Sequence, residues 1–348
     1  MSPFKSSAGR QLGKLIEGFK TSTIGKAFGS NEADLEYEIQ ITGTGNYSVL
    51  SRDGNYKFYV FNNPGTFTIT SLNQPLKSRV AVIGGGGSGA GYNAAYFAGN
   101  NGNPSTAFGF TAYGGGAGAM YPGNAGQPGG SGGGGSVSGG GGDGNKQTGT
   151  TTVAADLPQG FPGGPGDSTY GAGGGGGAGQ AGTAANVERS GAGGDGVILE
   201  MDKTGDGATG SLIPESLGTP GPIDGRWFGG GGGGGGGSTA NAASDIEGGA
   251  GGGGKGAGPT SAQPETAGQA NTGGGGGGWE DGGGGGAAGG GGAGGVVQRS
   301  KTFTPSDQNT TYPISIGAGG AAGHQSATNA GGSGVVLIRF ARFRILNT

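Results

Sequence analysis

The chain of 348 residues contains no cysteine and a single histidine, His324. Without cysteine it can form neither a disulfide framework nor thiolate metal sites, and one histidine cannot supply a histidine-rich metal cluster. Hydrophobic residues are 30% and aromatic residues 7% of the sequence, too few for an ordinary hydrophobic core along the whole chain. We therefore expect no enzymatic activity, no cofactor and no bound metal.

The hydrophobic pattern of the sequence indicates neither a secretory signal nor a transmembrane segment. The first 20 residues carry charges where a signal peptide would be apolar, and no hydrophobic run reaches membrane-spanning length. Residues 84–295 carry five Lys and Arg against fifteen Asp and Glu, whereas both flanks are mildly basic. An acidic middle and a pI near 5.2 argue against nucleic acid as a partner.

Glycine is what the chain has in excess: 100 residues, together with 16 prolines. Such a composition usually indicates disorder or a linker. Flexible linkers, however, mix glycine with serine, whereas alanine is the usual substitute here. The longest block, residues 229–237, consists of nine consecutive glycines.

Polyglycine II helices have three residues per turn and no internal hydrogen bonds, so parallel helices can satisfy one another's backbone groups. We predict that residues 84–295 form a bundle of such helices joined by loops. Interior helices leave no room for Cβ atoms. Pure glycine blocks should therefore be central, residues 229–237 most of all, and blocks that contain alanine peripheral.

The flanks of the glycine region show the period-two alternation of half-buried strands. The predicted strands cover residues 36–41, 47–50, 56–61, 66–70, 79–84, 296–304, 311–317 and 334–346. The predicted fold class is mainly β with irregular structure, in which a β-sandwich-like base carries the glycine bundle. Residues 36–83 supply the first part of the base, and residues 296–348 supply its closing strands.

Residues 1–35 form a segment of their own. Leu12, Leu15, Ile16 and Phe19 follow the spacing of one face of a short helix. Two glycines weaken this helix, so it should need a partner on which to dock. Attachment to a larger assembly and packing on the chain's own domain both remain open.

Two motifs suggest chemistry without the context that it requires. Gly84, Gly86 and Gly89 match a dinucleotide-binding fingerprint, but no amphipathic helix and no acidic ribose ligand follows. Residues 201–207 (MDKTGDG) are similar to part of a calcium-binding loop, but they lack the order of ligands that such a loop requires. Neither motif predicts a site.

Aromatic residues are the more informative candidates. One insert in the glycine region is crowded with them, and others stand directly at the ends of glycine blocks, where a loop would be presented. The candidates are Tyr92, Tyr96, Phe97, Phe108, Phe110, Tyr113, Trp227, Phe228 and Trp279. They could stack on a receptor or cap the bundle against water, and the sequence leaves both roles open.

Three segments in order around the glycine blocks carry a family resemblance: FNNPGTFTIT…RVAVIGGGGSG (61–89), TYPISIGAGGAAG (311–323) and NAGGSGVVLIRF (329–340). Together they resemble the glycine-rich domain of bacteriophage tail-fibre and adhesin proteins. The resemblance implies a β-rich base, a sandwich of polyglycine II helices, and variable distal loops that contact the host surface.

The expected function is that of a virion protein of the tail fibre. Its N-terminus would bind other tail or fibre proteins, and its loops would bind a host receptor, either a glycan or an outer-membrane protein. The alternative is a structural decoration or connector protein without a receptor role. The oligomeric state, with a homotrimer as one option, stays open.

Overall fold

The computed structural model describes the chain from residue 37 to residue 341. Internal gaps in this description fall at residues 93–95, 146–158, 170, 187–188, 203–211, 237–245, 259–263, 281–285 and 324–327. The predicted helix around Leu12 to Phe19 lies outside the described residues. The described residues contain no α-helix, and none of their helical turns could span a membrane.

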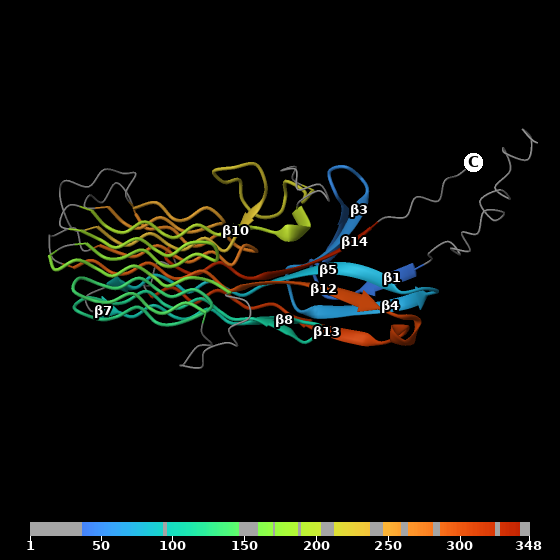
Figure 1. The fold of residues 1–348 in the computed structure, drawn as a ribbon. Coiled ribbons are helices and arrows are strands. Elements are labelled where there is room, and N and C mark those ends of the chain that lie inside the picture. The colour runs from blue at the N-terminus through green and yellow to red at the C-terminus, as the bar shows by residue number, and fades with distance from the viewer. Residues whose placement is uncertain are drawn as a thin grey trace, which may run out of the picture.

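Two five-stranded antiparallel sheets stand at one end of the molecule, and the glycine segments extend away from them (Figure 1). The first sheet has the order β1-β4-β13-β8-β9. Its strands are β1 (Tyr37–Ile41), β4 (Gly65–Leu72), β13 (Thr311–Ser315), β8 (Ser105–Ala107) and β9 (Phe110–Ala112). N- and C-terminal strands thus pair directly, as the alternating pattern of the flanks predicts.

The second sheet has the order β12-β5-β14-β3-β2. Its strands are β12 (Val296–Phe303), β5 (Leu76–Ile83), β14 (Val335–Ala341), β3 (Tyr56–Phe61) and β2 (Tyr47–Leu50). Strand β5 lies between the two C-terminal strands, and Ile83 at its end pairs with both Val296 and Val335. β5 and β14 are apolar over most of their length because both faces of this sheet are covered.

The hydrophobic core lies between the two sheets and is rich in aromatic rings. Phe67 of the first sheet stacks on Phe340 of the second, with ring centroids 6.1 Å apart, and meets Tyr59 edge to face at 6.0 Å. Phe303 completes this cluster and is fully buried. Aromatic rings thus supply much of the volume of this core.

The opposite face of the second sheet is covered by an insert between two glycine blocks. It contains β10 (Val197–Ile198), the 3₁₀ turn η1 (Glu200–Asp202) and β11 (Trp227–Phe228). Leu199, Ile213 and Phe228 pack there against Phe58 and Leu337 of the sheet. A second 3₁₀ turn, η3 (Pro305–Asp307), follows β12.

The glycine segments are held by hydrogen bonds between segments rather than within them. Gly230, Gly233 and Gly236 donate their N–H groups to Gly251, Gly254 and Ala257 of one neighbour, at 2.9 to 3.0 Å. The donors recur every third residue, and so do the acceptors. All eight N–H groups of residues 229–236 donate to other segments in this way.

The intervening donors of this block serve two other neighbours. Gly231 and Gly234 donate to the carbonyls of Gly194 and Gly191, and Gly232 donates to that of Gly291. Residues 229–236 are all buried, so the block lies inside the glycine region as predicted.

Two sequence expectations need correction. Residues 105–112, which the prediction placed in the glycine region, return to the base as the hairpin β8–β9, because Phe108 and Gly109 form a tight turn with φ of 52° and 82°. Alanine is not confined to the periphery either. Ala288 and Ala293 are 3% and 0% exposed in the segment that leads into β12.

Candidate recognition surface at the far end of the glycine region

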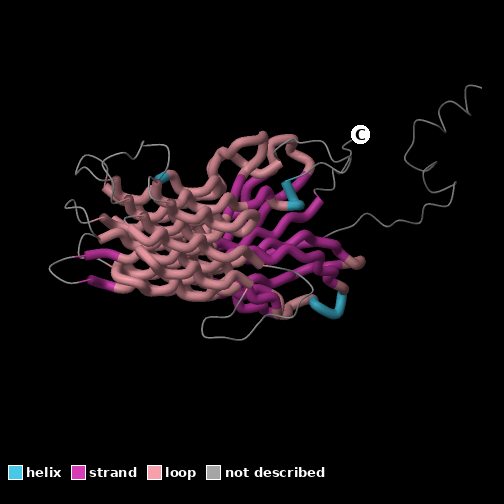
Figure 2. The backbone as a smooth tube through the Cα atoms, turned by 60° about the vertical axis from the view of Figure 1, so that its left-hand side comes forward, coloured by secondary structure: helices cyan, strands magenta, loops and turns pink. Residues whose placement is uncertain are grey.

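The far end is the end of the glycine region opposite the two sheets, and a short hairpin stands there. It is formed by β6 (Gly91–Tyr92) and β7 (Tyr96–Phe97), the two short strands at that end in Figure 2. Tyr92 and Tyr96 are register partners in this hairpin, and Gly91 pairs with Phe97. The side chain of Phe97 is 42% exposed, although a large apolar group is usually covered.

Trp279 lies beside this hairpin, so it shares the far end with the predicted aromatic residues of β6 and β7. Its backbone N–H donates to the carbonyl of Ala90, which directly precedes β6, at 3.2 Å. Its carbonyl accepts the N–H of Ala288 at 3.0 Å, and its side chain is half-buried. Phe97 and Trp279 thus come from different inserts but share one end of the molecule.

Carboxylates accompany the aromatic residues at this end. Glu280 follows Trp279 and is only 7% exposed. Glu265, on a neighbouring segment, is 6% exposed and accepts the Thr328 hydroxyl at 2.6 Å. Among the described residues, no group of three His, Cys, Asp or Glu side chains could hold a metal ion.

The structure places three other predicted aromatic residues at the opposite end. Phe108 and Phe110 pack on the base core, where the Phe108 ring lies 5.3 Å from that of Phe67. Tyr113 lies where the glycine segments join the base, and its N–H donates to the side-chain oxygen of Gln159 at 2.9 Å. The aromatic cluster of residues 92–113 is therefore divided between the two ends, since the chain runs back to the sheets between Phe97 and Phe108.

Trp227 and Phe228 also lie near the sheets. Phe228 is 1% exposed and belongs to the cluster that covers the second sheet. Trp227 is half-buried and donates its indole N–H to the carbonyl of Ile223 at 3.2 Å. Both residues therefore pack against the chain itself at the end of the glycine block that is near the sheets.

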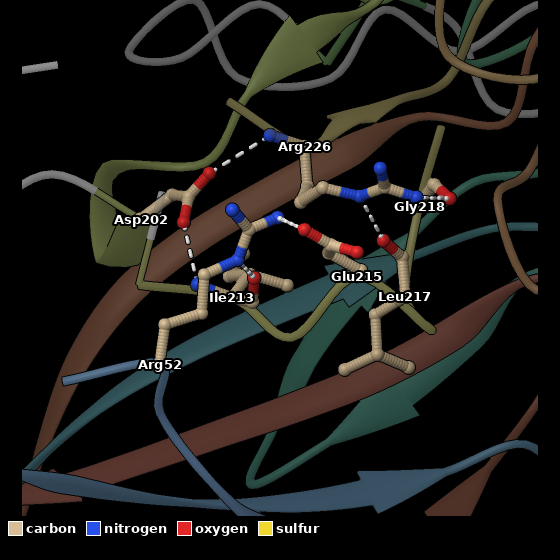
Figure 3. Close-up of polar contacts among 7 residues, drawn as sticks. All are labelled: Arg52, Asp202, Ile213, Glu215, Leu217, Gly218 and Arg226. Atoms are coloured by element: carbon tan, nitrogen blue, oxygen red, sulfur yellow. Dashed lines mark hydrogen bonds and ion pairs between the residues drawn. The ribbon is translucent and has the colours of Figure 1, made fainter. Parts of the chain in front are cut away.

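A polar cluster holds the covering insert in place, and no pattern in the sequence predicts it (Figure 3). The carboxylate of Asp202, 1% exposed, accepts the backbone N–H of Ile213 at 2.6 Å and that of Arg226 at 2.9 Å. Asp202 was part of the weak calcium motif, and here its carboxylate organises backbone turns.

The guanidinium of Arg226 extends this cluster. It donates to the carbonyls of Leu217 and Gly218, each at 2.6 Å. Burial lowers the pKa of Arg226, and the neighbouring Arg52 lowers it further. Arg52 itself donates to the carbonyl of Ile213 at 3.1 Å. These contacts connect the insert to the base, so the cluster is structural.

Comparisons of the chain with protein-family models, with curated proteins and with solved structures found no match.

Proposed function

We propose that the glycine segments are polyglycine II helices packed side by side. The support is the three-residue recurrence of donors, which is the period of that helix, and the absence of hydrogen bonds within residues 229–236. A Cβ added at Gly232 or Gly233 would lie 2.0 or 2.2 Å from a carbonyl oxygen of a neighbouring segment. Only glycine therefore fits at these two positions, because a side chain would collide with the neighbouring segment, as it would along the axis of collagen.

We propose that the chain is a bacteriophage tail-fibre or adhesin protein that binds a receptor on the host surface with the far end of this bundle. The observation that carries the proposal is the ordered hydrogen-bond lattice, which holds the loops at the far end away from the base. A rigid support reduces the entropy that loops lose on binding, and several copies per particle would add avidity.

At the far end, Phe97 and Trp279 are the residues proposed to contact the receptor. Phe97 is the stronger candidate, because an exposed aromatic ring can be covered by a partner without leaving a polar group unpaired. Leu12, Leu15, Ile16 and Phe19 remain the proposed attachment to the virion. No residue is proposed to have a catalytic role.

The test is binding of the purified, labelled full-length chain to a panel of bacterial cells, measured by flow cytometry. We expect saturable binding to at least one strain and its loss in Phe97→Asp. Leu50→Asp is the matched control, because Leu50 is 43% exposed but lies in the base, on β2. Binding that survives Phe97→Asp would move the contact away from this hairpin.

Electron microscopy of virions with a labelled copy of the chain would locate it on the particle. A tail or fibre position together with cell binding would support the adhesin. A position on the particle without binding to any strain would instead favour the decoration or connector protein.

A further inference from the structure

A groove of about 570 Å³ lies where the base meets the glycine region, away from the far end. Its walls come from the turn between β3 and β4 (Asn62, Asn63), from Asn271 and Ser333 at the ends of glycine blocks, and from the segment after β13 (Ile316, Ala318). The described residues that line it are all uncharged. Its volume lies in the range that small ligands occupy.

The turn that carries Asn62 and Asn63 is fixed by a third asparagine. The side-chain oxygen of Asn46 accepts the backbone N–H groups of Asn62 and Asn63, at 3.1 and 3.2 Å. The Asn46 amide nitrogen donates to the carbonyl of Thr42 at 2.8 Å, which orients that side chain. This wall of the groove is therefore rigid before any ligand arrives.

Two of the lining amide side chains, those of Asn63 and Asn271, each use only one of their two polar atoms within the described chain. Asn63 donates through Nδ2 to the carbonyl of Thr44 at 3.0 Å, and its Oδ1 accepts no hydrogen bond within the described chain. Asn271 accepts the Ser333 hydroxyl on Oδ1 at 3.1 Å, and its Nδ2 donates none to the described residues. The lining of the groove thus includes an unused acceptor and an unused donor, neither of which is charged.

The turn that carries Asn62 and Asn63 also contains a polar atom without a hydrogen bond among the described residues. The Oδ1 atom of Asn62 is buried and has no partner in the part of the chain that the structure describes. Buried polar atoms are nearly always paired, so an unpaired one is a departure that calls for a physical reason. An ordered water within this wall would supply the missing donor.

We infer that this groove binds a neutral saccharide. Sugar hydroxyls both donate and accept, so they match the acceptor of Asn63 and the donor of Asn271 that the described chain leaves unused in the lining. Pro64 and Ile316 add apolar surface on which the C–H face of a sugar ring could rest. An anionic ligand would lack a cationic partner here, and a peptide would need an open strand edge or an apolar pocket. The inference does not depend on the proposed role of the far end.

The test uses saturation-transfer-difference NMR on the full-length protein. The probes are the methyl glycosides of glucose, galactose, mannose and N-acetylglucosamine at millimolar concentration, with sialic acid as the charged comparison. We expect transfer to at least one neutral glycoside and none to sialic acid. Absence of transfer to all four neutral probes, or transfer to sialic acid alone, would overturn the inference.

Ala318→Glu is the blocking variant, because Ala318 is exposed and lines the groove. Ala321→Glu is its matched control: Ala321 is also exposed, lies three residues further along the same segment, and is not a lining residue. We expect the signal to disappear in the first variant and persist in the second. An unchanged signal in Ala318→Glu would place the sugar elsewhere and refute the site.

If Ala318→Glu fails to fold, Asn63→Ala replaces it, since Asn63 is exposed and its loss removes the free acceptor. We expect a roughly two- to tenfold weaker affinity, which corresponds to the loss of one neutral hydrogen bond. An affinity unchanged in Asn63→Ala would equally refute the assignment.

Discussion

Gly233→Ala should destabilise the protein more than a single methyl group normally does. A Cβ at this position would lie 2.2 Å from the carbonyl oxygen of Ile246, whereas real Cβ contacts stay beyond 3.0 Å. The two segments would have to separate by about 0.8 Å on that side. Because residues 229–236 are buried among other segments, such a shift must stretch or break hydrogen bonds.

The cost follows from the two bonds that Gly233 makes. Its N–H donates to Gly254 at 2.9 Å, and its carbonyl accepts from Gly278 at 2.8 Å. Leaving both pairs unsatisfied in a buried site costs roughly 2–6 kcal/mol. Alanine recovers about 0.4–1 kcal/mol by restricting the unfolded chain. The net loss is roughly 1–5.6 kcal/mol, which at its upper end is a large part of the 5–15 kcal/mol that stabilises a typical domain.

Gly140→Ala is the control that isolates the contact. Gly140 also lies in a glycine block, but it is exposed, and a Cβ there would meet nothing within 4 Å. This variant should be neutral or more stable by up to about 1 kcal/mol. Scanning calorimetry of the two variants and the parent measures the difference. Equal midpoints for Gly233→Ala and Gly140→Ala would show that the glycine block is a solvated linker and would refute the packing argument.

Three further outcomes are expected. Asp202→Asn puts an amide NH₂ against one of the two backbone N–H groups that the carboxylate accepts. The covering insert should lose about 2–3 kcal/mol of stability. Its amide hydrogens should exchange faster, as mass spectrometry would report. The hydrogen bond from Tyr312 lowers the pKa of Asp307, so the folded protein should lose stability as the pH drops below about 4. The melting temperature should change less between about pH 5 and pH 2 in Tyr312→Phe than in the parent, and an equal change would count against this hydrogen bond. Phe97→Asp should abolish cell binding without changing the melting temperature, while Leu50→Asp keeps both.

The strands of the base could be predicted from the sequence because their pattern reports burial directly. Tyr37, Ile39 and Ile41 alternate with polar residues, and they form β1 with these three side chains against the core. The pairing partner of each strand was harder to predict from the sequence. Nothing local to β5 indicates that it lies between β12 and β14, since register over more than 200 residues depends on how the whole base closes.

The position of each aromatic residue along the long axis was not predictable from the sequence. Phe97 and Phe108 are separated by one short glycine-containing segment, yet one lies at the far end and the other in the base core. Composition does not show whether a segment runs from the base to the far end or from the far end back to the base. The φ of 52° at Phe108 marks a turn that Gly109 alone only suggests.

The expectation for alanine was wrong for a physical reason that the structure makes clear. Ala172 and Ala287 are buried together with Val137 in a small apolar cluster, and Ala178 packs on the covering insert near the sheets. A methyl group is accommodated where a segment meets such a cluster instead of another backbone. The neighbours of each position therefore decide whether alanine fits, and these neighbours come from distant parts of the sequence.

The second sheet explains how segments without side chains find a single register. A bare glycine chain could slide along its neighbours, since each shift by one period restores the same hydrogen bonds. Ile83 pairs with both Val296 and Val335, so three segments leave the sheet at one level. Just beyond, Gly84 donates to Gly295 and Gly334 donates to Gly317, which carries the alignment of the strands into the glycine region. Side-chain packing in the base thus sets the register of a lattice that has almost no side chains of its own.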